Sequence, residues 1–124
     1  MDRSNFENLD VYKLAEYLSD SIWDTVLKWD DFARSTVGRQ IVRAADSIGA
    51  NIAEGAGKGS FKDNKRFVRM ARGSLNETIY WLERTRKREL IASDPFLSLK
   101  SMTNELAPRL NAYLKSIGKG FDKM

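Results

Sequence analysis

Apolar residues recur every three or four positions in four stretches of this chain, and that spacing is typical of amphipathic helices. The pattern predicts helices at roughly 9–29, 36–56, 61–88 and 95–117, with no strands. The positions expected to face a shared core are Tyr12, Ala15, Leu18, Ile22, Val26 and Trp29, then Val37, Ile41, Ala45, Ile48 and Ile52, then Phe67, Ala71, Leu75, Thr78 and Leu82, and finally Phe96, Leu99, Thr103, Leu106, Leu110, Tyr113 and Ile117.

Turn-forming and capping residues separate these stretches. Asp30 and Asp31 are expected to end the first helix, and Ser35 or Thr36 to cap the second. The glycines at positions 55, 57 and 59 are expected to end the second helix. Each boundary therefore has a residue type suited to it.

The later boundaries carry equally specific signals. Ser60 with Asp63 resembles a capping box, and Asp94 before Pro95 resembles an N-cap followed by proline at the first helical position. Pro108 breaks the pattern, because a proline inside a helix removes a hydrogen bond, and it predicts a kink near Glu105 or a break.

The chain has 124 residues, which is the size of one domain. Short connections between helices favour neighbours that run antiparallel. We therefore predict an all-α, antiparallel up-and-down four-helix bundle spanning residues 1–124, with residues 118–124 frayed.

Composition removes several classes of function. The chain has no cysteine and no histidine, which excludes disulfides, thiolate zinc sites and cysteine nucleophiles, and also the commonest general base. We predict no enzymatic activity, no cofactor and no metal. No apolar run approaches the ~20 residues of a membrane span, and Met1–Asn5 is polar, so we predict a cytoplasmic protein.

Charge is unevenly distributed along the chain. The formal net charge is +4, but residues 1–31 hold three basic and eight acidic residues, whereas residues 58–88 hold ten basic and three acidic ones. Several long cations on one rigid helix face are what phosphate binding requires. The candidate nucleic-acid-binding residues are Arg39, Arg43, Lys58, Lys62, Lys65, Arg66, Arg69 and Arg72.

Other interpretations of these cations stay open. They could form a solvated face, dock an acidic or nucleic-acid-handling protein partner, or meet acidic residues of a neighbouring subunit. Arg43 could equally pair with Asp46. RNA is the favoured ligand, and a protein–protein adaptor is the alternative.

Asn51, Glu54 and Glu77 lie beside the apolar seams of the second and third helices. Paired carboxylates can act as an acid and a base, but no nucleophile or metal motif accompanies them. A structural hydrogen-bond network is the preferred interpretation. The glycine-rich stretch 55–60 lacks the spacing of a nucleotide-binding loop.

The first helix carries an acidic stripe that suits a subunit contact. Glu16, Asp20 and Asp24 recur every four residues, and Trp23 adds an aromatic side chain beside them. An acidic first helix and a basic third helix are complementary, so the acidic stripe could meet basic residues of a neighbouring subunit.

Four stretches resemble the four-helix bundle proteins encoded in intervening sequences of bacterial large-subunit ribosomal RNA genes. They are residues 6–12 (FENLDVY), 43–55 (RAADSIGANIAEG), 60–67 (SFKDNKRF) and 71–77 (ARGSLNE). The resemblance implies an antiparallel four-helix bundle assembled as a ring, commonly a homopentamer. The accessory protein of diversity-generating retroelements is similar in fold and engages nucleic acid. Gly49, where many relatives carry proline, and Pro108 depart from the family pattern.

Overall fold

Four long helices and three short helical turns account for most of residues 6–119, the part of the chain that the structure, a computed structural model, describes. The side chain of Asn8 lies outside this description. The elements in chain order are η1 (Phe6–Asn8), α1 (Asp10–Val26), α2 (Asp31–Ala33), the π-helical turn η2 (Arg34–Gly38), α3 (Arg39–Ala56), α4 (Phe61–Lys87) and α5 (Ser93–Ser116).

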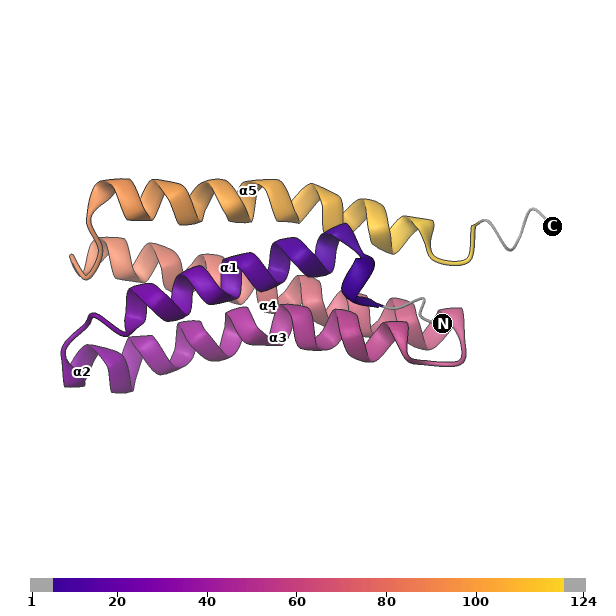
Figure 1. Ribbon diagram of the computed structural model, residues 1–124, viewed down its shortest axis with the longest axis horizontal. Helices are drawn as coiled ribbons and strands as arrows, with labels where there is room; N and C mark the ends of the chain where they lie inside the picture. The colour runs from indigo at the N-terminus through magenta and orange to yellow at the C-terminus, as the bar shows by residue number, and fades with distance from the viewer. Residues whose placement is uncertain (1–5, 120–124) are drawn as a thin grey trace.

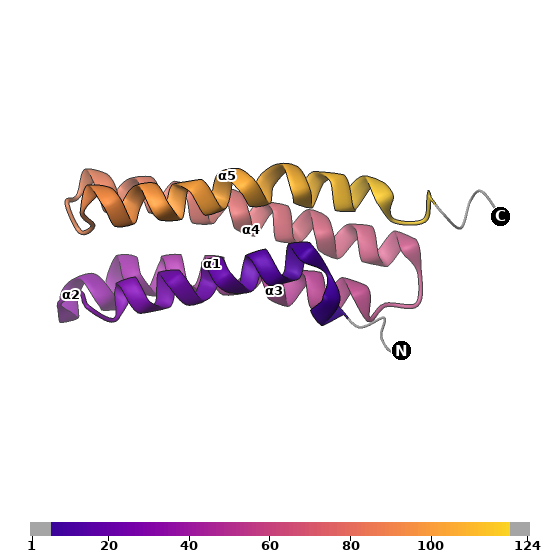
Figure 2. The ribbon, with the colours of Figure 1, turned by 45° about the horizontal axis from the view of Figure 1, so that its top comes forward.

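The four long helices lie side by side as an elongated bundle (Figure 1). α1 packs against α3 and α5, and α4 packs against the same two helices, so α1 and α4 occupy opposite corners. The connections from α1 to α3 and from α4 to α5 lie at one end of the bundle, and the connection from α3 to α4 lies at the other (Figure 2).

The core follows the apolar seams predicted from the sequence. Leu18, Ile48, Leu75 and Leu106 contribute from the four long helices and are almost completely buried. Three threonines are buried with them. Their hydroxyls donate to backbone carbonyls one turn earlier, so the buried hydroxyls are satisfied within their own helices. These threonines are Thr78, Thr85 and Thr103.

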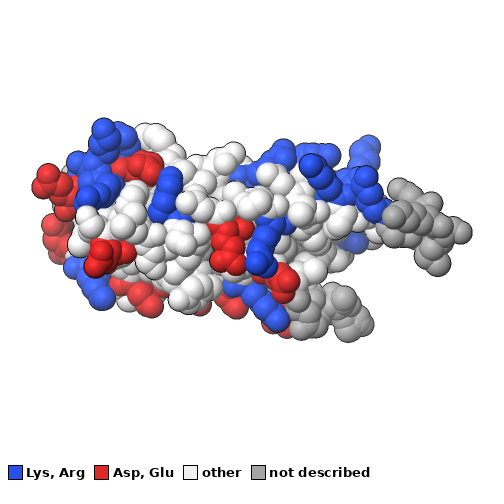
Figure 3. Space-filling model, turned by 90° about the horizontal axis from the view of Figure 1, so that it is seen from above, with Lys and Arg blue, Asp and Glu red and all other residues white. Residues whose placement is uncertain are grey.

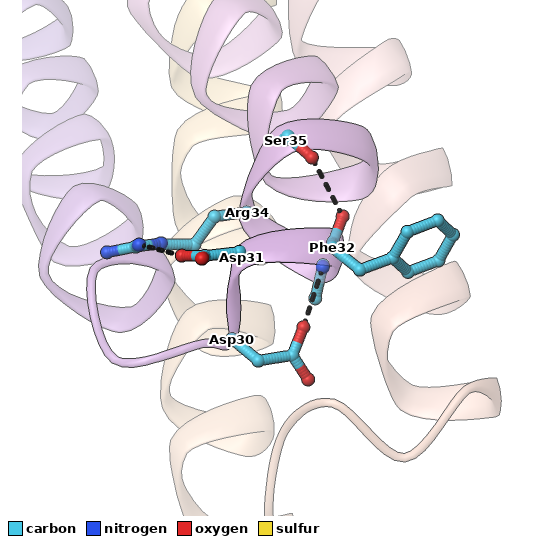
Figure 4. A network of polar contacts seen from close by, with 6 residues as sticks. Asp30, Asp31, Phe32, Arg34 and Ser35 are labelled. Atoms are coloured by element: carbon cyan, nitrogen blue, oxygen red, sulfur yellow. Dashed lines mark hydrogen bonds and ion pairs between the residues drawn. The ribbon is translucent and has the colours of Figure 1, made fainter.

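Helical structure begins at Asp31, before the predicted start of the second helix at 36, although α3 itself begins only at Arg39, and the predicted caps were wrong. Asp30 is the N-cap residue, because its carboxylate accepts a hydrogen bond from the Ala33 backbone N–H at 2.9 Å (Figure 4). Ser35 and Thr36 lie inside the helical turns that follow, and their hydroxyls donate to the Phe32 carbonyl instead. α1 ends at Val26, so Asp30 starts a helix rather than ending one.

The third long helix begins as predicted. The Ser60 hydroxyl accepts a hydrogen bond from the Asp63 backbone N–H at 3.1 Å, and α4 starts at Phe61. α3 ends at Ala56 with Gly57 as its C-cap residue. Gly55 lies inside α3 and is buried against α4, so its role is close packing rather than helix termination.

The last helix differs from prediction at its start and at Pro108. α5 begins at Ser93 with Ala92 as N-cap, which places Pro95 at the third helical position. The first N–H groups of a helix have no intrahelical partner, so proline is tolerated there too.

α5 continues through the exposed Pro108 to Ser116, so the predicted break was wrong. The predicted frayed tail covered residues 118–124. Gly118 has a positive φ of 85°, and residues 120–124 lie outside the described part.

Candidate nucleic-acid interface

The N-terminal half of α4 presents a row of cations that we call the basic strip. Its members recur every three or four residues, which places them along one side of the helix. They are Lys62, Lys65, Arg69 and Arg72. Lys65 is half-buried and the others are exposed. Within residues 6–119, neither lysine nor Arg69 forms an ion pair, so their charges are not neutralised locally.

α5 adds a cation to this surface, which the sequence pattern did not indicate. The Arg72 guanidinium donates to Asn111 Oδ1 at 3.3 Å, and the Phe61 ring lies against Gly118. The start of α4 therefore runs beside the end of α5. Lys115 lies one turn beyond Asn111, is exposed, and extends the basic strip across the helix boundary.

Lys58 and Arg66 are partly neutralised by local acids. Lys58 Nζ lies 3.1 Å from Glu54 Oε2, and Arg66 Nε lies 3.8 Å from Asp63 Oδ1. Both cations also lie over the Phe67 ring, at 5.1 and 4.6 Å from its centroid. These contacts hold the two side chains against the α3–α4 junction, so they are less free to reach a phosphate.

The structure does not bring Arg39 and Arg43 to the basic strip. Both are exposed near the start of α3, at the end of the bundle opposite to the start of α4 (Figure 1). Arg43 does not pair with Asp46, whose carboxylate instead accepts a hydrogen bond from Ser19 of α1. Arg39 lines a shallow hollow with Trp23 and Val42.

The three polar residues assigned to one network lie apart from one another. Asn51 donates to the Ser47 carbonyl at 2.9 Å, and Glu54 pairs with Lys58. Glu77 is exposed and has no ion-pair partner among the described residues. No hydrogen bond between described residues joins the three, so each acts within its own helix.

The acidic residues of α1 border a hollow of about 290 Å³ between α1 and α3, which we call the acidic hollow. Glu16 and Asp20 line it from α1, and Asp46 lines it from α3. Small residues of α3, Gly49, Ala50 and Ala53, also line it. Asp24 lies further along α1 and is exposed, as is Trp23.

Tyr12 also lines the acidic hollow, and the pKa of its hydroxyl is shifted by the charges around it. Burial raises the pKa of the Tyr12 hydroxyl, and the nearby carboxylates of Glu16, Glu7 and Asp20 raise it further. The hollow therefore disfavours anions and favours cations.

On the face of the molecule shown in Figure 3, Lys and Arg side chains gather at the end where α4 begins and α5 ends, while the opposite end carries both signs. In the described part of the chain, no helix is long and apolar enough to span a membrane, and no cluster of acidic side chains is arranged to hold a metal ion.

The fold is an all-helical bundle of four long helices without strands in its described part. Over residues 7–112 the sequence matches the 23S rRNA-intervening sequence protein family, and the chain belongs to that family. No curated protein matches it.

A solved structure is similar to this one. It is described as a protein with unknown function from the S23 ribosomal protein family of Bacteroides thetaiotaomicron VPI-5482. It shares 26% sequence identity with this chain at a TM-score of 0.76, and the match covers 86% of this chain and 99% of the other.

Proposed function

We propose that this protein binds nucleic acid, RNA in preference, through the phosphate contacts of the basic strip. The observation that carries this proposal is the set of unpaired cations Lys62, Lys65 and Arg69 on one rigid helix. Because no local acid neutralises them, a phosphate backbone can displace their counterions without breaking an existing contact. Lys115 widens the surface on which a strand could lie.

Phosphate contacts carry no sequence information, so binding should depend on charge and little on sequence. The half-buried Phe67, with two cations over its ring, is poorly placed to stack on a base. Phe61 is 47% exposed at the start of α4 and is the better candidate for stacking.

We also propose that the protein is a cytoplasmic, non-enzymatic homo-oligomer. The antiparallel up-and-down topology predicted from the short connections suits a ring, with five subunits as the family resemblance implies. The outward faces of α1 and α4 carry opposite charges and lie at opposite corners of the bundle, which supports head-to-tail contacts.

The test of nucleic-acid binding is a titration with a structured RNA, a single-stranded RNA and a matched duplex DNA across a salt series. The variant reverses Lys62, Lys65 and Arg69 to glutamate. Wild-type affinity should fall steeply with salt, and the variant should lose most of its binding. A second variant replaces the same three residues with glutamine. If each residue contacts one phosphate, the slope of log binding constant against log salt concentration for single-stranded RNA should become shallower by about 2.

A matched control reverses three cations outside the basic strip, Lys13, Lys28 and Lys87, which are exposed and form no ion pair with other described residues. It makes the same change in net charge, so retained binding would assign the effect to the basic strip rather than to overall charge. Absence of wild-type binding at low salt, or equal loss in both variants, would refute the proposal.

A protein adaptor is the second candidate function, and one observation favours it. Phe32 of α2 is 79% exposed at the end of the bundle, and its ring projects away from the hydrogen bonds that fix the turn (Figure 4). It borders a hollow of about 440 Å³ with Val37, Arg88 and Leu90. If Phe32→Ala abolishes recovery of a nuclease-resistant protein partner while RNA binding persists, the adaptor role is supported.

A further inference from the structure

An exposed glycine in the middle of α4 has no explanation within the subunit. Gly73 lies inside a helix of 27 residues, and a Cβ added there would meet nothing within 4 Å. A glycine inside a helix is less stable than alanine, because it gives up more backbone freedom on folding. Neither a turn, nor a positive φ, nor a close contact within the described chain requires glycine here.

Gly73 is the centre of a second row on α4, which we call the glycine-centred strip. Its members are spaced by four, three, four, three and four residues, so they share one face of the helix. They are Arg66, Met70, Gly73, Glu77, Tyr80 and Arg84. Met70 is 47% exposed and Tyr80 is 54% exposed, which leaves two large apolar side chains in solvent on either side of the glycine. This strip lies next to the basic strip but is distinct from it.

The opposite corner of the bundle presents a complementary face. Glu16, Asp20 and Asp24 line α1, and Tyr17, Trp23 and Leu27 are between 52% and 61% exposed among them. This face is acidic and apolar, whereas the glycine-centred strip combines the large side chains Met70 and Tyr80 with an arginine at each end and one acid, Glu77, so its net charge is +1 (two basic residues minus one acidic). The two faces match in both charge and polarity.

We infer that the glycine-centred strip of α4 is the surface on which α1 of a second copy of this chain docks. Gly73 permits the close approach of a backbone or of a bulky side chain such as Trp23, which explains why a side chain is absent there. Arg66 and Arg84 lie opposite the acidic residues of the incoming α1. Since α1 and α4 occupy opposite corners, each copy has one of each face free, and the contact is heterologous.

This inference deepens the self-association in the proposed function and does not depend on nucleic-acid binding. The basic strip lies on the side of α4 toward α5, where Arg72 bonds Asn111, so it remains open when the glycine-centred strip is covered. One helix thereby serves two partners through adjacent faces.

The first experiment measures self-association by sedimentation velocity over a dilution series. Gly73→Ala should raise the Tm measured at dilution, where the subunit is isolated, because alanine stabilises a helix. It should also weaken self-association by about tenfold or more, because the added methyl separates the two surfaces. Ser101→Ala on the exposed face of α5 is the control, and it should leave self-association unchanged. A higher Tm with unchanged self-association in Gly73→Ala would overturn the inference.

The second experiment tests the head-to-tail arrangement by mixing two variants. Gly73→Leu blocks the α4 face, and the double variant Asp20→Arg with Asp24→Arg blocks the α1 face. Each alone should remain a monomer, and the mixture should form a heterodimer that grows no further, because each variant retains the one face that the other needs. A mixture that stays monomeric, a Gly73→Leu variant that associates like wild type, or a wild type that is monomeric at every concentration would refute the interface. None of these readouts uses RNA, so failure of the RNA titration leaves them unaffected.

Discussion

Asn64 of α4 lies so close to Gly55 of α3 that a Cβ added at residue 55 would stand 2.6 Å from the Asn64 side-chain oxygen. The Asn64 backbone oxygen and the Phe67 Cβ would each lie at 3.0 Å. Gly55 is thus a point of close approach between α3 and α4, the two most extensively packed helices of the bundle. The contact fixes how α4 leaves the connection and therefore where the basic strip points.

Gly55→Ala is expected to lower the free energy of unfolding by about 1–3 kcal/mol, because the methyl group forces α3 and α4 apart. Urea denaturation would measure the change. Gly57→Ala is the matched control, since its Cβ would meet nothing closer than 3.7 Å. Equal stability of the two variants would contradict this prediction, because it would mean that α3 and α4 can move apart at residue 55 without a loss of stability.

Alanine substitutions at Asp30 and Ser35 should show which of the two residues caps the start of α2. Asp30→Ala removes the acceptor for the Ala33 N–H and should cost about 1 kcal/mol of stability. Ser35→Ala should change stability little, because the Ser35 hydroxyl bonds only the Phe32 carbonyl within a helical turn. Thermal denaturation of both variants would decide. A larger loss for Ser35→Ala would contradict the assignment of Asp30 as the cap.

Pro108→Ala should stabilise the protein by up to about 3 kcal/mol, because alanine restores the backbone N–H that proline lacks inside α5. Pro108 is exposed, so the change removes no buried packing. Asn104→Ala, on the exposed side of the same helix, should stabilise by only a few tenths. If Pro108→Ala destabilises the bundle in denaturant titrations, the proline has a role in shaping α5 that outweighs the lost hydrogen bond.

The raised pKa of Tyr12 predicts a loss of stability at alkaline pH. The folded protein holds the Tyr12 proton above the ordinary pKa of 10.0, where the unfolded chain releases it. The folded state then binds more protons, so stability is unaffected below pH 10 and falls as the pH rises through and beyond that value. Tyr12→Phe should flatten this fall in denaturation measured across alkaline pH. In a titration followed by the ultraviolet absorbance of ionised tyrosine, the variant should lack the one tyrosine that ionises above the ordinary pKa. An unchanged profile would mean that the acidic hollow does not act on Tyr12.

Much of the fold could be predicted from the sequence because apolar periodicity is a local signal. Leu18, Ile48, Leu75 and Leu106 were expected in the core from their spacing alone, and they are buried there. Boundaries were less accurate where several residues compete for the same role. Asp30, Ser35 and Thr36 can all cap a helix, and only the backbone path shows that Asp30 does so.

The candidate site was predictable only in part. The basic strip belongs to one helix, so spacing was sufficient to group its members. Lys115 was not included, because its place beside α4 depends on the packing of α5, fixed by the Arg72–Asn111 hydrogen bond and the contact of Phe61 with Gly118. Arg39 and Arg43 were grouped with the strip because they share a face of their helix and could extend the basic surface, yet α3 carries them to the opposite end of the bundle.

The sequence by itself determined which residues form helices, which faces are apolar and how charge is divided along the chain, because each of these depends on neighbours a few positions apart. Tertiary structure alone decided which charged faces lie together, which cations stay unpaired, and that Gly73 faces open space while Gly55 does not. Those properties depend on contacts between residues distant in sequence, and helical periodicity carries no information about which helix lies alongside which.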